Sequence, residues 1–256
     1  MRRLLIIGIG AGDPDHMTVQ AIDALNSADV VLVPEKEGKD GLAALRHDIC
    51  RRFMTRTDWR TVAYKVPKRA APDLSYRQVV DDWHEAIGDI WGRLLSEDVK
   101  DGETAAYLVW GDPSIYDSTL RIVERLAAKG DVAFDYEVIP GITSIQALAA
   151  RHRIALNTIG GPIHVTTGRR LGQEGPGTAD SIVVMLDGEL AFTTVDADEF
   201  DIYWGANLGT ESEVAIAGRL SEKSSEITEA RAKARDKAGW VMDTYLLRRK
   251  DNGAKE

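Results

Sequence analysis

The chain has 256 residues, 44% of them hydrophobic and 29% charged, which is enough for one large or two small cores. Its formal net charge of -9 argues against a nucleic-acid partner, because phosphate binding requires clustered Lys and Arg side chains. The single cysteine, Cys50, excludes an internal disulfide, and no apolar stretch reaches the ~18 residues of a membrane-spanning helix. We therefore expect a cytoplasmic protein that binds neither nucleic acid nor membrane.

The first half alternates between apolar, strand-like runs and amphipathic, helix-like stretches. Strands are expected at 3–9, 29–34, 61–66, 105–111 and 136–140. Helices are expected between them, at 18–26, 41–53, 76–95 and 118–129. This alternation predicts a mainly parallel sheet with helical crossovers.

The second half has shorter strands that are separated mostly by loops. A helix at 144–151 and a hinge at 157–162 precede strands at 163–167, 181–186, 201–204, 214–220 and 244–249. The glycine-rich segment 171–178 is predicted to be a mobile loop, and 222–237 a solvated helix. We therefore predict an α/β fold of two α/β domains, 1–157 and 158–256, the second with some antiparallel pairing.

Two Gly-Asp-Pro turns follow apolar runs, Gly12-Asp13-Pro14 in the first segment and Gly111-Asp112-Pro113 after the fourth strand. Ligands of open α/β sheets sit outside the carboxyl ends of the strands, so these turns predict one ligand site. The segment Gly8-Ile9-Gly10-Ala11-Gly12 does not fit the dinucleotide fingerprint. Its third glycine comes one residue early, and Asp13 places negative charge where a pyrophosphate would lie.

Three segments resemble motifs of the tetrapyrrole methylases. Gly10-Ala11-Gly12-Asp13-Pro14 resembles their opening motif, Leu108–Tyr116 their Gly-Asp-Pro loop, and Val138–Ser144 their third motif. Each motif is weak by itself, but all three occur in the family's order and at similar spacing. The resemblance implies a fold of two α/β domains with S-adenosyl-L-methionine (SAM) folded in the cleft between them. Since relatives are often dimers, it also implies a homodimer as one expected assembly.

The resemblance also implies which residues bind the cofactor. The Gly-Asp-Pro loop supplies Gly111, Asp112, Ile115 and Tyr116, and the third motif supplies Thr143 and Ser144. Leu186, where relatives often have a methionine, and Leu208 are implied contacts from the second domain. Asp112 could instead only cap its turn, and Thr143 and Ser144 could cap the following helix.

The catalytic and substrate-binding residues are harder to assign. Some relatives carry an aspartate at the end of the second strand, where this chain has Pro34. We take the adjacent Glu35 as a candidate base and Lys36 as a partner for a substrate carboxylate, with an ordinary charged loop as the alternative. Arg153, Arg169 and Arg170 are candidates for binding substrate carboxylates, since arginine pairs bidentately with them. No metal-ligand spacing is found.

The second half narrows the resemblance within the family. Segments 163–171, 203–211 and 239–249 resemble the member that methylates ring carbon 1 of precorrin-5 and releases acetate. This implies a precorrin as the small-molecule substrate and SAM as the methyl donor. One alternative is a sister methylase that acts at another precorrin position or on a diphthine or rRNA target. The other is a catalytically silent ligand-binding module.

Overall fold

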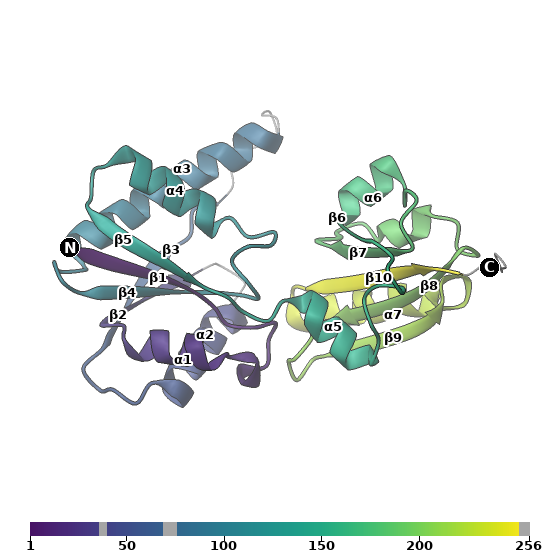
Figure 1. The fold of residues 1–256 in the computed structure, drawn as a ribbon, viewed down its shortest axis with the longest axis horizontal. Coiled ribbons are helices and arrows are strands. Elements are labelled where there is room, and N and C mark those ends of the chain that lie inside the picture. Colours follow the sequence, from purple (N-terminus) through teal and green to yellow (C-terminus); the bar gives the residue numbers. More distant parts are fainter. Residues whose placement is uncertain (36–39, 69–75, 251–256) are drawn as a thin grey trace. The chain divides into compact units, whose positions relative to one another are not determined.

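The apolar runs of the first half form a fully parallel, five-stranded sheet with the order β3-β2-β4-β1-β5 (Figure 1). The structure, a computed structural model, describes residues 1–35, 40–68 and 76–250. The strands are β1 (Arg2–Gly8), β2 (Val30–Glu35), β3 (Arg60–Lys65), β4 (Thr104–Val109) and β5 (Phe134–Ile139). The sheet is covered on both faces, which explains the near-continuous apolar sequence of β1, β2 and β4.

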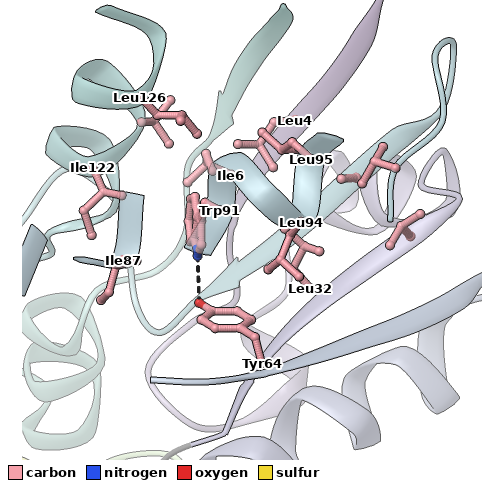
Figure 2. Close-up of a cluster of buried hydrophobic side chains, with 14 of the residues drawn as sticks. Leu4, Ile6, Leu32, Tyr64, Ile87, Trp91, Leu94, Leu95, Ile122 and Leu126 are labelled. Atoms are coloured by element: carbon pink, nitrogen blue, oxygen red, sulfur yellow. Dashed lines mark hydrogen bonds between the residues drawn. The ribbon is translucent and has the colours of Figure 1, made fainter. Parts of the chain in front are cut away.

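Two helices cover each face of this sheet (Figure 1). One layer contains α1 (Val19–Asn26) and α2 (Asp40–Phe53), and the other α3 (Tyr76–Glu97) and α4 (Thr119–Lys129). Figure 2 shows the core beneath α3 and α4, where the buried Trp91 indole donates a hydrogen bond to the Tyr64 hydroxyl at 3.0 Å. The predicted parallel sheet with helical crossovers is therefore confirmed.

The second half forms a mixed sheet with the order β6-β7-β10-β8-β9. Its strands are β6 (Ile163–Thr167), β7 (Ser181–Met185), β8 (Phe200–Ala206), β9 (Val214–Arg219) and β10 (Asp243–Arg249). β6 and β7 pair in parallel, whereas the other pairs are antiparallel, as expected for this half. The helices are α5 (Ser144–His152), α6 (Gly168–Glu174) and α7 (Leu220–Ala238), and short 3-10 turns occur at Pro14–His16 and Ala191–Thr194.

The two compact units of the chain are Met1–Ile142 and Thr143–Glu256, which differs from the expected boundary after residue 157. Helix α5 belongs to the second unit because it packs on β8, β9 and β10. Leu148 of α5, for example, lies so close to Gly205 that a Cβ on that glycine would be 2.9 Å from its Cδ1. The glycines at 160–161 suggested a linker, but the packing of α5 sets the boundary earlier.

The prediction of a mobile loop at 171–178 is wrong for its first residues. Helix α6 runs through Glu174, because Thr167 caps it by accepting a hydrogen bond from the Arg170 amide and Leu171 is buried in the core. Within the described ranges, no helix has both the length and the apolar character needed to cross a membrane.

Candidate functional site

Three glycines meet where the neighbouring strands β4, β1 and β5 end. A Cβ on Gly8 would lie 2.6 Å from the Gly141 nitrogen, and a Cβ on Gly141 would lie 2.2 Å from the Gly111 carbonyl oxygen. All of these neighbours are backbone atoms, so the contacts cannot be relieved by a side-chain movement. Glycine is therefore required at 8 and 141, and the carboxyl edge of the sheet is a closely packed backbone corner.

The second Gly-Asp-Pro turn is joined by backbone hydrogen bonds to Gly10, two residues before the first turn. The Gly111 amide donates to the Gly10 carbonyl at 2.8 Å, and the Gly10 amide donates to the Gly111 carbonyl at 3.3 Å. Gly111 has φ +71°, and apart from its own atoms and its two chain neighbours no described atom lies within 4 Å of the position where its Cβ would be. The turn thus leaves space for another molecule to approach its backbone closely, as a cofactor loop requires.

Asp112 is buried and links the turn to the third motif. One carboxylate oxygen accepts a hydrogen bond from the Gly141 amide at 2.8 Å, and the other accepts from the Ser114 amide at 2.8 Å and from the Ser114 hydroxyl. Burial tends to raise the pKa of Asp112, but these hydrogen bonds outweigh it and hold the pKa below its ordinary value. The carboxylate is therefore ionised at neutral pH, and it fixes the backbone of both loops. A direct contact to a cofactor stays a prediction.

The rest of the loop presents Ile115 and Tyr116. Ile115 is half-buried, whereas Tyr116 is 42% exposed and has φ +50°, an unusual backbone conformation for an aromatic residue. Asp117 then accepts a hydrogen bond from the amide of Thr119, the first residue of α4, at 2.7 Å. The loop between β4 and α4 therefore displays an exposed aromatic ring on a well-anchored turn.

Thr143 and Ser144 begin α5 in the second unit. The Thr143 hydroxyl accepts from the Ile145 and Gln146 amides, and the Gln146 side chain accepts from the Thr143 amide, which completes a capping box. The Ser144 hydroxyl lies 3.0 Å from the Thr244 hydroxyl on β10. Thr143 thus has the capping role that is the alternative to cofactor binding, whereas the Ser144 hydroxyl ties α5 to β10. Cofactor binding by either residue stays a prediction.

Leu186 and Leu208 have opposite environments. Leu186 directly follows β7, is 65% exposed and has φ +53°. Leu208 is only 4% exposed, because its side chain packs on Gly205. Asn207, just before it, is buried with φ +50°, and its side-chain oxygen accepts from the Met242 amide at 3.1 Å. Leu208 can therefore offer a ligand mainly its backbone, and Leu186 its side chain.

The candidate catalytic and substrate-binding residues are mostly at the surface. Glu35 is exposed at the end of β2, and Lys36 lies outside the described residues. Arg153, Arg169 and Arg170 are exposed on the second unit. The Arg170 guanidinium donates to Glu174 at 3.0 Å, a surface pair weak enough to exchange for a substrate carboxylate. No group of three potential metal ligands occurs among the described residues.

The positions that sequence reasoning missed are those that hold the loops. Gly8, Ser114 and Asn207 make close packing or hydrogen bonds that position the predicted residues. The signal for Gly8 was present, since a glycine ends the apolar run of β1. The role of Ser114 could be suspected from the Asp-Pro-Ser turn, in which a carboxylate commonly binds the amide two residues on.

The model of the tetrapyrrole (corrin/porphyrin) methylases matches residues 3–224. The chain belongs to the tetrapyrrole methylase family. It is similar to the deacetylating precorrin-6A synthase of a Sinorhizobium species, with 56% identity over 97% of this chain and 96% of the relative. It is also 32% identical to the precorrin-2 C(20)-methyltransferase of a Sinorhizobium species, over 56% of this chain and 55% of that relative.

Solved structures of tetrapyrrole methylases share the fold. A cobalamin-synthesis-related protein of Corynebacterium diphtheriae, CobF, has a TM-score of 0.83 and 38% identity and covers 98% of this chain and 100% of its own. The uroporphyrin-III C-methyltransferase of Thermus thermophilus, solved with S-adenosylhomocysteine, has a TM-score of 0.56 and 19% identity, with 96% coverage of each chain. The likeness to CobF thus extends over both units.

Proposed function

We propose that this protein is a SAM-dependent C-methyltransferase that converts precorrin-5 to precorrin-6A, with methylation at C-1 and release of acetate. The observation that carries this proposal is the 56% identity over 97% of the chain to a deacetylating precorrin-6A synthase. The precorrin-2 C(20)-methyltransferase, a relative with another precorrin position, aligns with only 56% of this chain. Similarity through the second unit therefore favours this methylation position over that of a sister enzyme.

Each unit carries its own set of proposed cofactor contacts. The first unit supplies the Gly111–Tyr116 loop, with an open approach to the Gly111 backbone and an exposed tyrosine ring. The ionised Asp112 adds negative charge that favours a sulfonium cation, even though its oxygens are used within the protein. From the second unit, Leu186 supplies an apolar side chain, and Thr143, Ser144 and Leu208 supply polar and backbone groups. These features suit a donor-rich, cationic ligand with a large apolar surface.

The proposed reaction needs positioning for one step and a base for the other. Methyl transfer breaks the bond from sulfur to the methyl carbon as the ring carbon forms its new bond in line, so the protein contributes mainly by holding the two partners. Release of acetate consumes water, whose oxygen bonds to the carbonyl carbon of the departing two-carbon unit. The bond from that carbon to the ring then breaks, its electron pair stays with the ring, and a base takes the proton of the water.

Glu35 is the proposed base, and Lys36 and the three arginines are the proposed partners of substrate carboxylates. We predict that Glu35→Gln leaves the affinity for S-adenosylhomocysteine unchanged but slows turnover at least 100-fold, in the range typical of lost general-base catalysis. Calorimetry and acetate release measure the two effects. Turnover near that of the unaltered protein would remove Glu35 from the mechanism.

The proposed function is tested by incubating the protein with methyl-labelled SAM and precorrin-5, with acetate assayed alongside. We expect label in the corrinoid product and an equal amount of acetate. Labelled product without acetate would identify a sister methylase. Neither product, combined with calorimetric binding of S-adenosylhomocysteine, would identify a silent ligand-binding module.

A further inference from the structure

The loop after β7 exposes a large apolar side chain in a left-handed backbone conformation that burial of that side chain does not explain. Leu186 is 65% exposed, lies outside the buried core, and has φ +53°. Leu190, at the far end of the same loop, has φ +59°. Left-handed backbone is disfavoured for residues with a Cβ, and such conformations persist where the surroundings impose them, often at binding sites.

Asp187 imposes this conformation from within the loop. It is 3% exposed, and one carboxylate oxygen accepts from the Glu189 amide at 3.1 Å. The other oxygen accepts from the Ala191 amide at 2.7 Å and from the Tyr245 hydroxyl on β10 at 2.7 Å. Burial, together with the neighbouring carboxylate, raises the pKa of Tyr245, so its hydroxyl stays protonated and donates. The carboxylate therefore closes the turn and ties it to the sheet.

Further elements of the second unit fix Asp187 in place. Its carbonyl oxygen accepts from the Arg231 guanidinium of α7 at 2.7 Å, and Arg231 also donates to the buried Asp243 at 2.9 Å. Gly168, which begins α6, is so close that a Cβ there would lie 2.3 Å from the Asp187 carboxyl carbon. The loop that carries Leu186 is thus anchored by α6, α7 and β10, while the leucine itself points into no described core.

We propose that Asp187 and Tyr245 are positioning residues that hold Leu186 as a preformed apolar contact for the S-adenosyl donor. This inference rests on the proposed function, because it takes the donor as the ligand of the second unit. A network of this kind lowers the ordering cost of binding, since the contact is already in its bound conformation. Asp187 and Tyr245 then act on the ligand only through Leu186.

A double-mutant cycle tests this dependence. Leu186→Ala removes the contact, Tyr245→Phe removes one hydroxyl donor from Asp187, and the third variant combines both. Calorimetry with S-adenosylhomocysteine should show about tenfold weaker binding for Leu186→Ala, as expected for losing a buried leucine contact. Tyr245→Phe should weaken binding by about threefold, and the double variant should bind no more weakly than Leu186→Ala alone.

Thermal unfolding separates positioning from a general structural role. Tyr245→Phe should lower the melting temperature equally in both backgrounds, since Tyr245 donates to Asp187 whether or not Leu186 is present. Leu186→Met, which keeps a long apolar side chain, should bind S-adenosylhomocysteine with nearly the affinity of the unaltered protein. Unchanged affinity in Leu186→Ala, or fold-losses in affinity that multiply in the double variant, would overturn this inference but not the proposed function. Absence of binding by the unaltered protein would overturn the proposed function and the inference with it.

Discussion

Gly141→Ala is expected to abolish binding of S-adenosylhomocysteine and to lower the free energy of unfolding of the first unit by about 3 kcal/mol. The new Cβ would lie 2.2 Å from the Gly111 carbonyl oxygen and 2.8 Å from the Cα of Gly8. Because both neighbours are backbone atoms, the ends of β1, β4 and β5 would have to separate. The Gly10–Gly111 hydrogen bonds would be strained, and the 111–116 loop would move. Urea unfolding measures the stability, and calorimetry measures the binding.

Gly88→Ala is the matched control for this prediction. Gly88 lies inside α3, and apart from the nearby backbone of its own helix no described atom is within 4 Å of the position of its Cβ. Alanine in a helix interior is favoured over glycine by about 0.5–1 kcal/mol, so this variant should be slightly more stable and bind normally. If Gly141→Ala unfolded at the same urea concentration as the unaltered protein, the backbone corner would not be as closely packed as the structure shows.

The central strands of the first unit could be predicted because strands buried on both faces must be apolar at almost every position. Leu4–Ile7 and Val30–Val33 are buried on both faces of a parallel sheet, and such strands are apolar throughout. Helix ends were also predictable where a glycine was decisive. Gly130, with φ +72°, caps α4, which ends at Lys129 as expected.

The candidate site was only partly predictable, because its features depend on contacts between distant parts of the chain. The turn at 111–113 could be identified from its residue types. That a carboxylate oxygen of Asp112 accepts from Gly141 depends on the order of β4, β1 and β5 in the sheet. In the same way, nothing near Leu186 in the sequence indicates the hydroxyl of Tyr245, which reaches Asp187 from β10.

The unit boundary at Ile142 and the short helix α6 could not be predicted from the sequence for a related reason. The glycines at 160–161 indicate local flexibility, but the boundary at Ile142 depends on where the side chains of α5 pack. α6 has only seven residues, and its sequence contains Gly168 and Gly172, so helix propensity disfavours it. The buried Leu171 and the Thr167 cap outweigh this local preference.

Asp112→Asn should destabilise the first unit by about 2 kcal/mol at neutral pH, the cost of leaving a buried donor without its acceptor. The two carboxylate oxygens accept from three donors, the Gly141 amide and the amide and hydroxyl of Ser114. An asparagine has one acceptor oxygen, so its NH2 group must face one side of this arrangement. Because the link to Gly141 or to Ser114 is lost, binding of S-adenosylhomocysteine should weaken as well. Urea unfolding and calorimetry at pH 7 measure both effects.

The pH dependence identifies the carboxylate as the source of this stability. The pKa of Asp112 is below its ordinary value in the folded protein, so its ionised form stabilises the fold above the pKa of the unfolded chain, about 3.8. This contribution is lost as the pH falls through the folded-state pKa. The difference in free energy of unfolding between the unaltered protein and Asp112→Asn should therefore narrow below about pH 4.

Asp13→Asn, in the other Gly-Asp-Pro turn, is the control. There a single oxygen accepts from the Asp15 amide at 2.8 Å, and an asparagine oxygen can replace it, so stability should change by less than about 0.5 kcal/mol. A gap that stayed constant from pH 7 to pH 3 would show that the charge of Asp112 does not hold the two loops together.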